Sequence, residues 1–352
     1  MNKMFQWRMT TKDAPLELTE MPIPEIQKNE ILIKIAGCGV CHTDISFWHY
    51  GVPTRHELPL TLGHEISGTV VDGPSEWMGK PVIVPAVLPC GECDLCQADR
   101  SNICQHQLMP GNDFHGGFAS HIVVPSRFIS EIPPAVLDKT DLPTMSVIAD
   151  AVSTPYQVIE KSGLQSDEFA VIIGVGGVGL YAAALAKIKG AAVIALDIDA
   201  EKLNRLNSLG IDKTLDISGM DIRHIKKSVK TICKDLGAPS NRWKIFEMSG
   251  TKPGQELAFA LLGIAGTLSI VGFTLDKLEI RLSNLMAFDA NIIGTWGCKP
   301  ELYPAVIDLV GSGKLKISPF TELHPMGDIN TVFTGSLKHQ YLKRPVMVPD
   351  FD

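Results

Sequence analysis

The 352-residue sequence has no apolar run long enough to cross a membrane, no secretion-signal stretch at its N-terminus and no excess of basic residues. A membrane span needs roughly 20 consecutive apolar residues, and the opening segment MNKMFQWRMTTKDAPLEL is interrupted by charged and polar residues throughout. The 32 basic and 39 acidic residues give a formal charge of −7, which offers no general attraction to nucleic acid or anionic lipid. We therefore expect a cytoplasmic protein with no nucleic-acid or membrane partner.

The sequence also lacks internal repeats, low-complexity tracts and charged tails. Its 45% hydrophobic and 20% charged residues are typical of an ordinary globular protein rather than a disordered chain. A chain of this length exceeds the size at which single hydrophobic cores usually stop growing, so two domains are expected.

Two patterns divide the chain. From Glu30 to about Ile83 short apolar runs (EILIKIAG, ISGTVV, KPVIVPA) separated by Gly and Pro indicate a β-rich domain. From Phe169 apolar strands alternate with helical stretches over 178–189 and 201–209, which predicts a parallel, doubly wound sheet. Helices are then predicted over 300–310 and near 328–337, and RPVMVP is a strand that could return to the first domain. The sequence thus predicts an α/β protein in which a nucleotide domain, 152–297, is inserted into a discontinuous catalytic domain, 1–151 and 298–352.

A glycine-rich turn follows the apolar strand AVII. In GVGGVG the first glycine permits a tight turn, the second lets a pyrophosphate approach the backbone, and the third lets the following helix pack closely. Asp197, at the end of the next strand, could bind ribose hydroxyls and would repel a 2′-phosphate, which favours NAD over NADP. The residues predicted to bind the cofactor are Gly174, Gly176, Gly177, Val178, Gly179 and Asp197, with Lys202 as a further ribose contact.

Cysteines are crowded into one part of the chain, at positions 38, 41, 90, 93, 96 and 104. In a reducing compartment this crowding points to metal rather than disulfides, whereas the separate Cys233 and Cys298 are expected to be packing residues. Cys90, Cys93, Cys96 and Cys104 form C-x2-C-x2-C-x7-C in a loop near 88–106, which can surround one tetrahedral zinc. Four protein ligands leave no open position, so this zinc would be structural.

A second metal site is suggested by Cys41 in GVCHTD and by His64 and Glu65 in LGHE. A catalytic zinc needs three protein ligands and an open fourth position, because the substrate oxygen must reach the metal. Cys41 and His64 fit this requirement, but spacing alone does not identify the third ligand.

The motifs GVCHTD, GHE, the four-cysteine loop and GVGGVG, in this order, resemble the zinc-containing medium-chain alcohol dehydrogenase family over nearly the whole chain. The resemblance implies a GroES-like catalytic domain, a Rossmann domain for NAD, two zinc ions per chain and a homodimer or homotetramer. It also implies that Cys41 and His64 are ligands, that Glu65 is an adjacent or exchangeable carboxylate, and that Asp150 stands where many members have cysteine. Asp150 could be the third ligand, Glu65 could replace it, or the site could hold zinc weakly or not at all, as in a zinc-free reductase of activated double bonds.

The same resemblance assigns further roles. Thr43 would hydrogen-bond the substrate alcohol and start a proton path that could end at Ser46, at His49 or in water. Asp44 would support the zinc histidine. Contacts with the cofactor are implied for His42 and Arg344, at the pyrophosphate, and for Thr154, at the nicotinamide.

The segments MNKMFQWRMTT, PSEWMGKPVIVPAVLPCGECDLCQ and NDFHGGFASHIVVP look like those of one branch of this family, the 6-hydroxycyclohex-1-ene-1-carbonyl-CoA dehydrogenases of anaerobic aromatic degradation. That resemblance implies a small-molecule substrate, a cyclic acyl-CoA whose secondary hydroxyl is oxidised to a ketone. The cations that could meet the CoA phosphates are Arg55, His56, Lys299, Lys338 and Lys343. A dehydrogenase of a free alcohol or polyol would carry the same motifs, and a non-catalytic nucleotide-binding protein would have the same fold.

Overall fold

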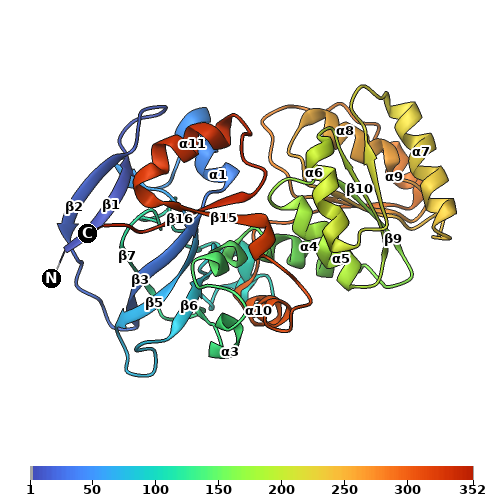
Figure 1. Cartoon of the computed structure of the whole chain (residues 1–352). Helices are drawn as coiled ribbons and strands as arrows, with labels where there is room; N and C mark the ends of the chain where they lie inside the picture. Colours follow the sequence, from blue (N-terminus) through green and yellow to red (C-terminus); the bar gives the residue numbers. More distant parts are fainter. Residues whose placement is uncertain (1–2, 352) are drawn as a thin grey trace. The chain divides into compact units, whose positions relative to one another are not determined.

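The computed structural model describes residues 3–351, which divide into two compact units. One unit comprises the residues up to Ser153 together with those from Gly297 onward, and the other is Thr154–Trp296 (Figure 1). The sequence placed these boundaries at 151/152 and 297/298. Within the described range, no helix has the length and apolar character required to cross a bilayer.

The unit Thr154–Trp296 is built on a parallel sheet with strand order β11-β10-β9-β12-β13-β14. The strands are β9 (Phe169–Ile173), β10 (Ala192–Asp197), β11 (Lys213–Asp216), β12 (Lys244–Glu247), β13 (Thr267–Ile270) and β14 (Asn291–Gly294). Numbered in order of appearance this is 3-2-1-4-5-6, the order of doubly wound dinucleotide-binding sheets. Every residue of β9 is buried because helices cover both faces of the sheet. The predicted doubly wound sheet is confirmed.

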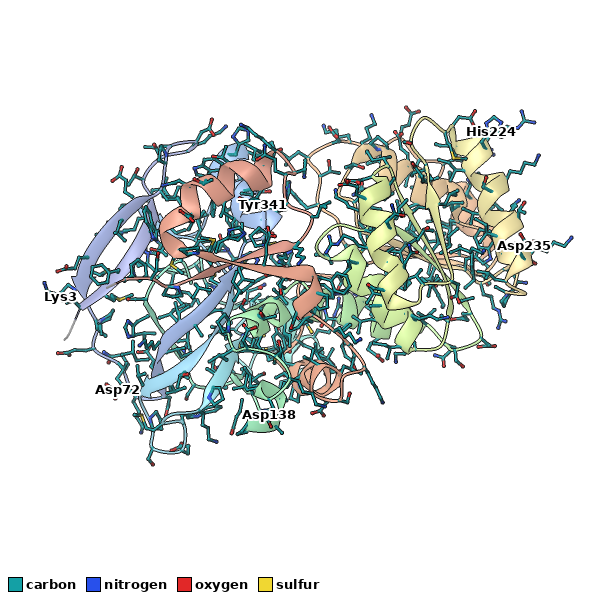
Figure 2. All side chains as sticks on the ribbon, in the orientation of Figure 1. Lys3, Asp72, Asp138, His224, Asp235 and Tyr341 are labelled. Atoms are coloured by element: carbon teal, nitrogen blue, oxygen red, sulfur yellow. The ribbon has the colours of Figure 1, made fainter. Side chains whose placement is uncertain are left out.

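One helix precedes the first strand of this sheet, and the others follow its strands. They are α4 (Ser153–Ser162), α5 (Gly179–Ile188), α6 (Ala200–Arg205), η4 (Leu206–Leu209), α7 (Ile222–Asp235), α8 (Lys252–Leu261) and α9 (Ser283–Phe288). Alternate side chains of β9, such as Val171, share one core with Val229 of α7 and Leu257 of α8. Between His224 and Asp235, the outer face of α7 carries charged side chains, and these point away from the sheet (Figure 2).

The other unit is β-rich, with one sheet of order β2-β1-β4 and a larger one of order β15-β16-β3-β5-β6-β8, in which β7 also pairs with β3. The strands are β1 (Lys3–Met9), β2 (Glu17–Pro22), β3 (Glu30–Gly39), β4 (Leu60–Thr61), β5 (Glu65–Asp72), β6 (Pro81–Val84), β7 (His121–Pro125), β8 (Ser130–Glu131), β15 (Thr321–Pro325) and β16 (Arg344–Val348). The three apolar runs predicted as strands are β3, β5 and β6. RPVMVP forms β16, which pairs antiparallel with β3 (Val346 opposite Gly39), so its predicted return to the first domain is confirmed.

Short helices connect these strands. They are α1 (His42–Ile45), η1 (Ser46–Tyr50), α2 (Asp94–Gln97), η2 (Ser101–Ile103), α3 (Pro134–Leu137), η3 (Thr144–Ala149), η5 (Pro300–Leu302), α10 (Tyr303–Gly311), η6 (Ser318–Phe320), η7 (Met326–Asp328) and α11 (Ile329–Leu337). Helix α11 contacts α1 (Figure 1), and its Phe333 packs edge-on against Trp48 and Phe118. Tyr341 covers Gly335 of α11 so closely that a Cβ there would lie 2.5 Å from its ring (Figure 2). This packing fixes α1, and with it the segment that contains Cys41.

Candidate metal centres and cofactor site

The first unit gathers Cys41, His64, Glu65 and Asp150, whose ligand atoms all lie within 4.8 Å of one another. Cys41 directly precedes α1, and Asp150 directly follows η3. Strands β3 and β5 pair so that Gly39 is opposite Glu65, which brings the segment after β3 beside His64 and Glu65. Sheet register therefore joins residues that are far apart in the sequence.

The spacing of three of these side chains fits one zinc ion. Asp150 Oδ2 lies 3.6 Å from Cys41 Sγ and 3.6 Å from His64 Nε2. Tetrahedral zinc, with bonds of about 2.0 to 2.3 Å, separates its ligand atoms by roughly 3.3 to 3.8 Å. One thiolate, one neutral imidazole and one carboxylate would also formally balance the double positive charge of the ion.

Asp44 holds both Cys41 and His64 in place. Its Oδ2 accepts a hydrogen bond from the Cys41 backbone N–H (2.9 Å), and its Oδ1 accepts one from Gly63 (3.0 Å). The same Oδ1 lies 3.3 Å from His64 Nδ1, on the side of the ring opposite the metal-facing Nε2. A carboxylate behind a histidine ligand orients the ring and raises its basicity.

Glu65 is held by Arg344. Two guanidinium nitrogens of Arg344, Nε and Nη2, donate to Glu65 Oε2 and Oε1 over 2.7 and 2.5 Å, and Oε1 also accepts from the Ala151 N–H (3.0 Å). Burial raises the pKa of the Glu65 carboxyl to about 7, while Arg344 acts in the opposite direction. Because both oxygens of Glu65 are engaged, the geometry favours Asp150 as the third ligand. No motif in the sequence indicated the pairing of Glu65 with Arg344, and contact of Arg344 with a pyrophosphate stays a prediction.

Thr43 lies beside the cluster of Cys41, His64 and Asp150, with its Oγ1 3.6 Å from Cys41 Sγ. The two side chains considered for the end of its proton path already have partners. Ser46 Oγ donates to the His42 carbonyl (2.9 Å), and His49 Nδ1 lies 2.7 Å from Asp13 Oδ1. His42 is exposed and its ring stacks on His339 at 6.0 Å between centroids.

The four-cysteine loop forms a compact cluster in the same unit. Its Sγ atoms are separated by 3.5 Å (Cys93 and Cys96), 3.6 Å (Cys93 and Cys104), 3.4 Å (Cys90 and Cys104) and 4.0 Å (Cys90 and Cys96). Zinc–sulfur bonds of about 2.3 Å predict separations of roughly 3.8 Å, so the cluster fits one zinc.

Cys38 was grouped with the metal cysteines by the sequence, and the structure places it elsewhere. Neither metal-binding group found among residues 3–351 contains it. Its side chain is fully buried in the core beneath Gly63, where a Cβ would lie 2.7 Å from the sulfur. Cys233 and Cys298 are buried as expected of packing residues.

The glycine turn after β9 is closely packed on one side and open on the other. Gly174 has φ +85°, and a Cβ on it would lie 2.7 Å from Ser249; a Cβ on Gly179 would lie 1.8 Å from the Gly174 carbonyl oxygen. At Gly176, by contrast, a Cβ would meet no atom of the described chain within 4 Å. The turn therefore leaves space for a phosphate at the glycine where the sequence predicted one.

Asp197 lies next to this turn. Its Oδ2 accepts from the Val175 N–H (2.7 Å) and its Oδ1 from the Asp199 N–H (3.1 Å). The carboxylate thus fixes the turn and stays partly accessible at the strand end. Lys202 is paired with Asp199 (Nζ to Oδ2, 3.6 Å), and Thr154, in α4, is buried.

Several cations proposed for CoA have local partners. Arg55 Nη1 lies 3.2 Å from Asp113 Oδ1, and Lys299 Nζ lies 2.5 Å from Asp99 Oδ1. The His56 ring lies 5.0 Å from that of His115. Lys338 and Lys343 are exposed.

Comparison with known proteins gives the family. Residues 27–134 match the alcohol dehydrogenase GroES-like domain, and residues 177–312 match the zinc-binding dehydrogenase domain. An alcohol dehydrogenase from Geobacillus stearothermophilus is 31% identical over 324 residues, covering 90% of this chain and 91% of the relative. The chain belongs to the zinc-type alcohol dehydrogenase family.

Other members of the family are similar over comparable lengths. A sorbitol dehydrogenase from Halalkalibacterium halodurans is 27% identical and is covered over 84% of each chain. The solved alcohol dehydrogenase of Aeropyrum pernix has a TM-score of 0.85 at 28% identity, over 98% of this chain and all of that one. The GroES-like and Rossmann expectations are confirmed, and the chain is an oxidoreductase of the class that acts on CH–OH groups.

Proposed function

We propose that this chain is a zinc-dependent, NAD-linked dehydrogenase that oxidises a secondary alcohol to a ketone. The observation that carries the proposal is the placement of Cys41 Sγ, His64 Nε2 and Asp150 Oδ2 at separations suited to one zinc ion, in a member of a family of alcohol and polyol dehydrogenases.

The chain's own groups have distinct parts in this reaction. Cys41, His64 and Asp150 would hold the ion and leave one coordination position open. Zinc there would supply Lewis acidity toward a substrate hydroxyl, and NAD would supply the hydride acceptor. Thr43 Oγ1 would accept the hydroxyl proton and donate its own onward. Asp44 would hold the imidazole ring of His64 in the same orientation during the whole reaction.

The four cysteines of the loop, Cys90, Cys93, Cys96 and Cys104, would hold the second, structural zinc. The glycine turn and Asp197 would hold NAD, with Gly176 giving the pyrophosphate access to backbone. The roles of His42, Thr154 and Arg344 in cofactor binding, and that of Lys202 at the ribose, are part of the same proposal.

We propose further that the protein is a homo-oligomer assembled through the segment 273–296. Edge strand β14 lies in this segment, and Phe273, Leu275, Leu282, Met286 and Trp296 are exposed there, between 52% and 80%. An exposed edge strand beside a large apolar surface is typical of a subunit interface. Changing Leu282 and Met286 together to glutamate should reduce the particle mass to that of the 38.2 kDa monomer in mass photometry. An unchanged mass would place the interface elsewhere.

The substrate we propose is 6-hydroxycyclohex-1-ene-1-carbonyl-CoA, oxidised to its 6-oxo product. The proposed substrate rests on the resemblance of three sequence segments to those of the acyl-CoA dehydrogenating branch. The exposed Lys338 and Lys343 are the cations with which the CoA phosphates could pair. The competing substrate is a free polyol or simple alcohol, which the sorbitol dehydrogenase among the relatives favours.

The test is NADH formation by the purified protein with NAD and, in separate reactions, the cyclic hydroxyenoyl-CoA, its free acid, sorbitol and a series of simple secondary alcohols. Fast reduction with the thioester alone would support the acyl-CoA proposal. Fast reduction with polyols or simple alcohols would keep the zinc dehydrogenase and discard CoA. Inactivity with every substrate, together with a single zinc per chain, would favour the zinc-free reductase.

A further inference from the structure

The turn that bears Asp150 is fixed by a buried tyrosine from the C-terminal part of the chain. Tyr303 begins α10, is fully buried, and its hydroxyl donates to the carbonyl of Ala149, the residue before Asp150. The hydroxyl also accepts from the Ala86 N–H (3.2 Å). Ser153 Oγ donates to the same carbonyl (3.2 Å). The backbone at Asp150 is therefore anchored by side chains, although no regular helix or strand contains it.

The residues just before Tyr303 are attached to the four-cysteine loop. Lys299 Nζ lies 2.5 Å from Asp99 Oδ1, and Ser101 Oγ donates to Glu301 Oε2 over 2.8 Å. Asp99 and Ser101 both lie between Cys96 and Cys104. The Leu302 N–H donates to the Lys299 carbonyl (3.1 Å), which closes the intervening turn. Residues 299–303, the bridging segment, thus contact the cysteine loop at one end and the Asp150 turn at the other.

We propose that the bridging segment couples the four-cysteine loop to the catalytic metal site, with Tyr303 as a positioning residue for Asp150. The proposal rests on the function proposed above, since it requires a metal at Asp150. The Asp150 carboxylate lies 3.6 Å from both Cys41 Sγ and His64 Nε2. It can bind an ion well only if the backbone of its turn is held in a fixed position. Order in the cysteine loop therefore contributes to the affinity of a second, separate ion.

The experiment replaces the catalytic-site zinc with Co²⁺, whose visible absorption reports ligand geometry, and measures cobalt affinity by competition with a chelator. Tyr303→Phe removes only the hydroxyl that bonds the Ala149 carbonyl. Because the loss of outer contacts that orient a ligand weakens metal binding, this change should weaken cobalt binding about 10-fold and alter the absorption bands. The double change Lys299→Ala with Glu301→Ala cuts the bridging segment from the loop and should weaken cobalt binding by about threefold, since such surface contacts are individually weak.

A matched control is Lys139→Ala, which removes a lysine that donates to the Gly311 carbonyl at the other end of α10. This variant should leave cobalt affinity and absorption as in the unmodified protein. The double variant changes side chains that reach the surface. If Tyr303→Phe does not fold, the double variant still tests the coupling. Unchanged cobalt affinity and spectrum in both variants, with two metals bound by the unmodified protein, would overturn the coupling alone. Binding of only one metal by the unmodified protein would refute the catalytic metal site and the coupling together.

Discussion

Replacing Asp150 with alanine is expected to lower bound zinc from two ions per chain to one and to reduce kcat/KM by roughly 10³-fold. Asp150 Oδ2 supplies the oxygen that faces both Cys41 Sγ and His64 Nε2. Without it two ligands remain, and Glu65 cannot readily take its place because Arg344 and Ala151 occupy its oxygens. Loss of several kcal/mol of Lewis-acid stabilisation corresponds to about this factor in rate. Zinc content is measured by elemental analysis and the rate by NADH absorbance.

The informative control is Asp150→Cys, which restores an anionic ligand of the kind that many family members have at this position. It should retain two zinc ions and recover much of the activity. NADH binding, followed by fluorescence, should be nearly unchanged in both variants, since the glycine turn and Asp197 belong to the other unit. Two zinc ions bound by Asp150→Ala would remove Asp150 from the ligand set.

The parts of the fold that could be predicted from the sequence are those encoded in short segments. The GVGGVG turn, the alternation of strands and helices, and the C-x2-C-x2-C-x7-C spacing each depend on residues that are close in the chain. Strand β16 could also be predicted because RPVMVP is apolar and β-branched residues favour strands.

The sequence could not show side-chain contacts between residues that are far apart in the chain. Glu65 and Arg344 are 279 residues apart, and Tyr303 is 154 residues from the carbonyl it holds. No local periodicity records such contacts. Lys299 illustrates the same difficulty: from the sequence it was a free cation for a phosphate, but folding places it against Asp99, 200 residues away. Asp150 itself was identified only through the family resemblance, because its place beside Cys41 depends on long-range contacts such as the hydrogen bond from Tyr303 to the Ala149 carbonyl.

Replacing Asp197 with asparagine is expected to reduce the preference for NAD over NADP by about 100-fold, measured as the ratio of kcat/KM for the two cofactors. A hydrogen bond from a ribose hydroxyl to a carboxylate is worth about 1.5 to 3 kcal/mol, and removing the charge also relieves repulsion of a 2′-phosphate. Asparagine is chosen because its one acceptor oxygen can still bind the Val175 N–H, which Asp197 Oδ2 accepts over 2.7 Å. The Val175 hydrogen bond should therefore survive, while the negative charge and the hydrogen bond from the Asp199 N–H to Oδ1 (3.1 Å) are lost.

Asp199→Asn is the matched control for this experiment. Asp199 is the next acid along the chain, but its Oδ1 accepts from the Glu201 and Lys202 N–H groups (3.0 and 3.2 Å) at the start of α6. Its substitution should lower thermal stability slightly and leave the cofactor ratio unchanged. If Asp199→Asn alters the ratio as much as Asp197→Asn, the discrimination comes from the summed negative charge at this strand end rather than from a hydrogen bond to the ribose. If neither variant alters it, Asp197 serves only to hold the glycine turn, and the choice of cofactor is made by other residues.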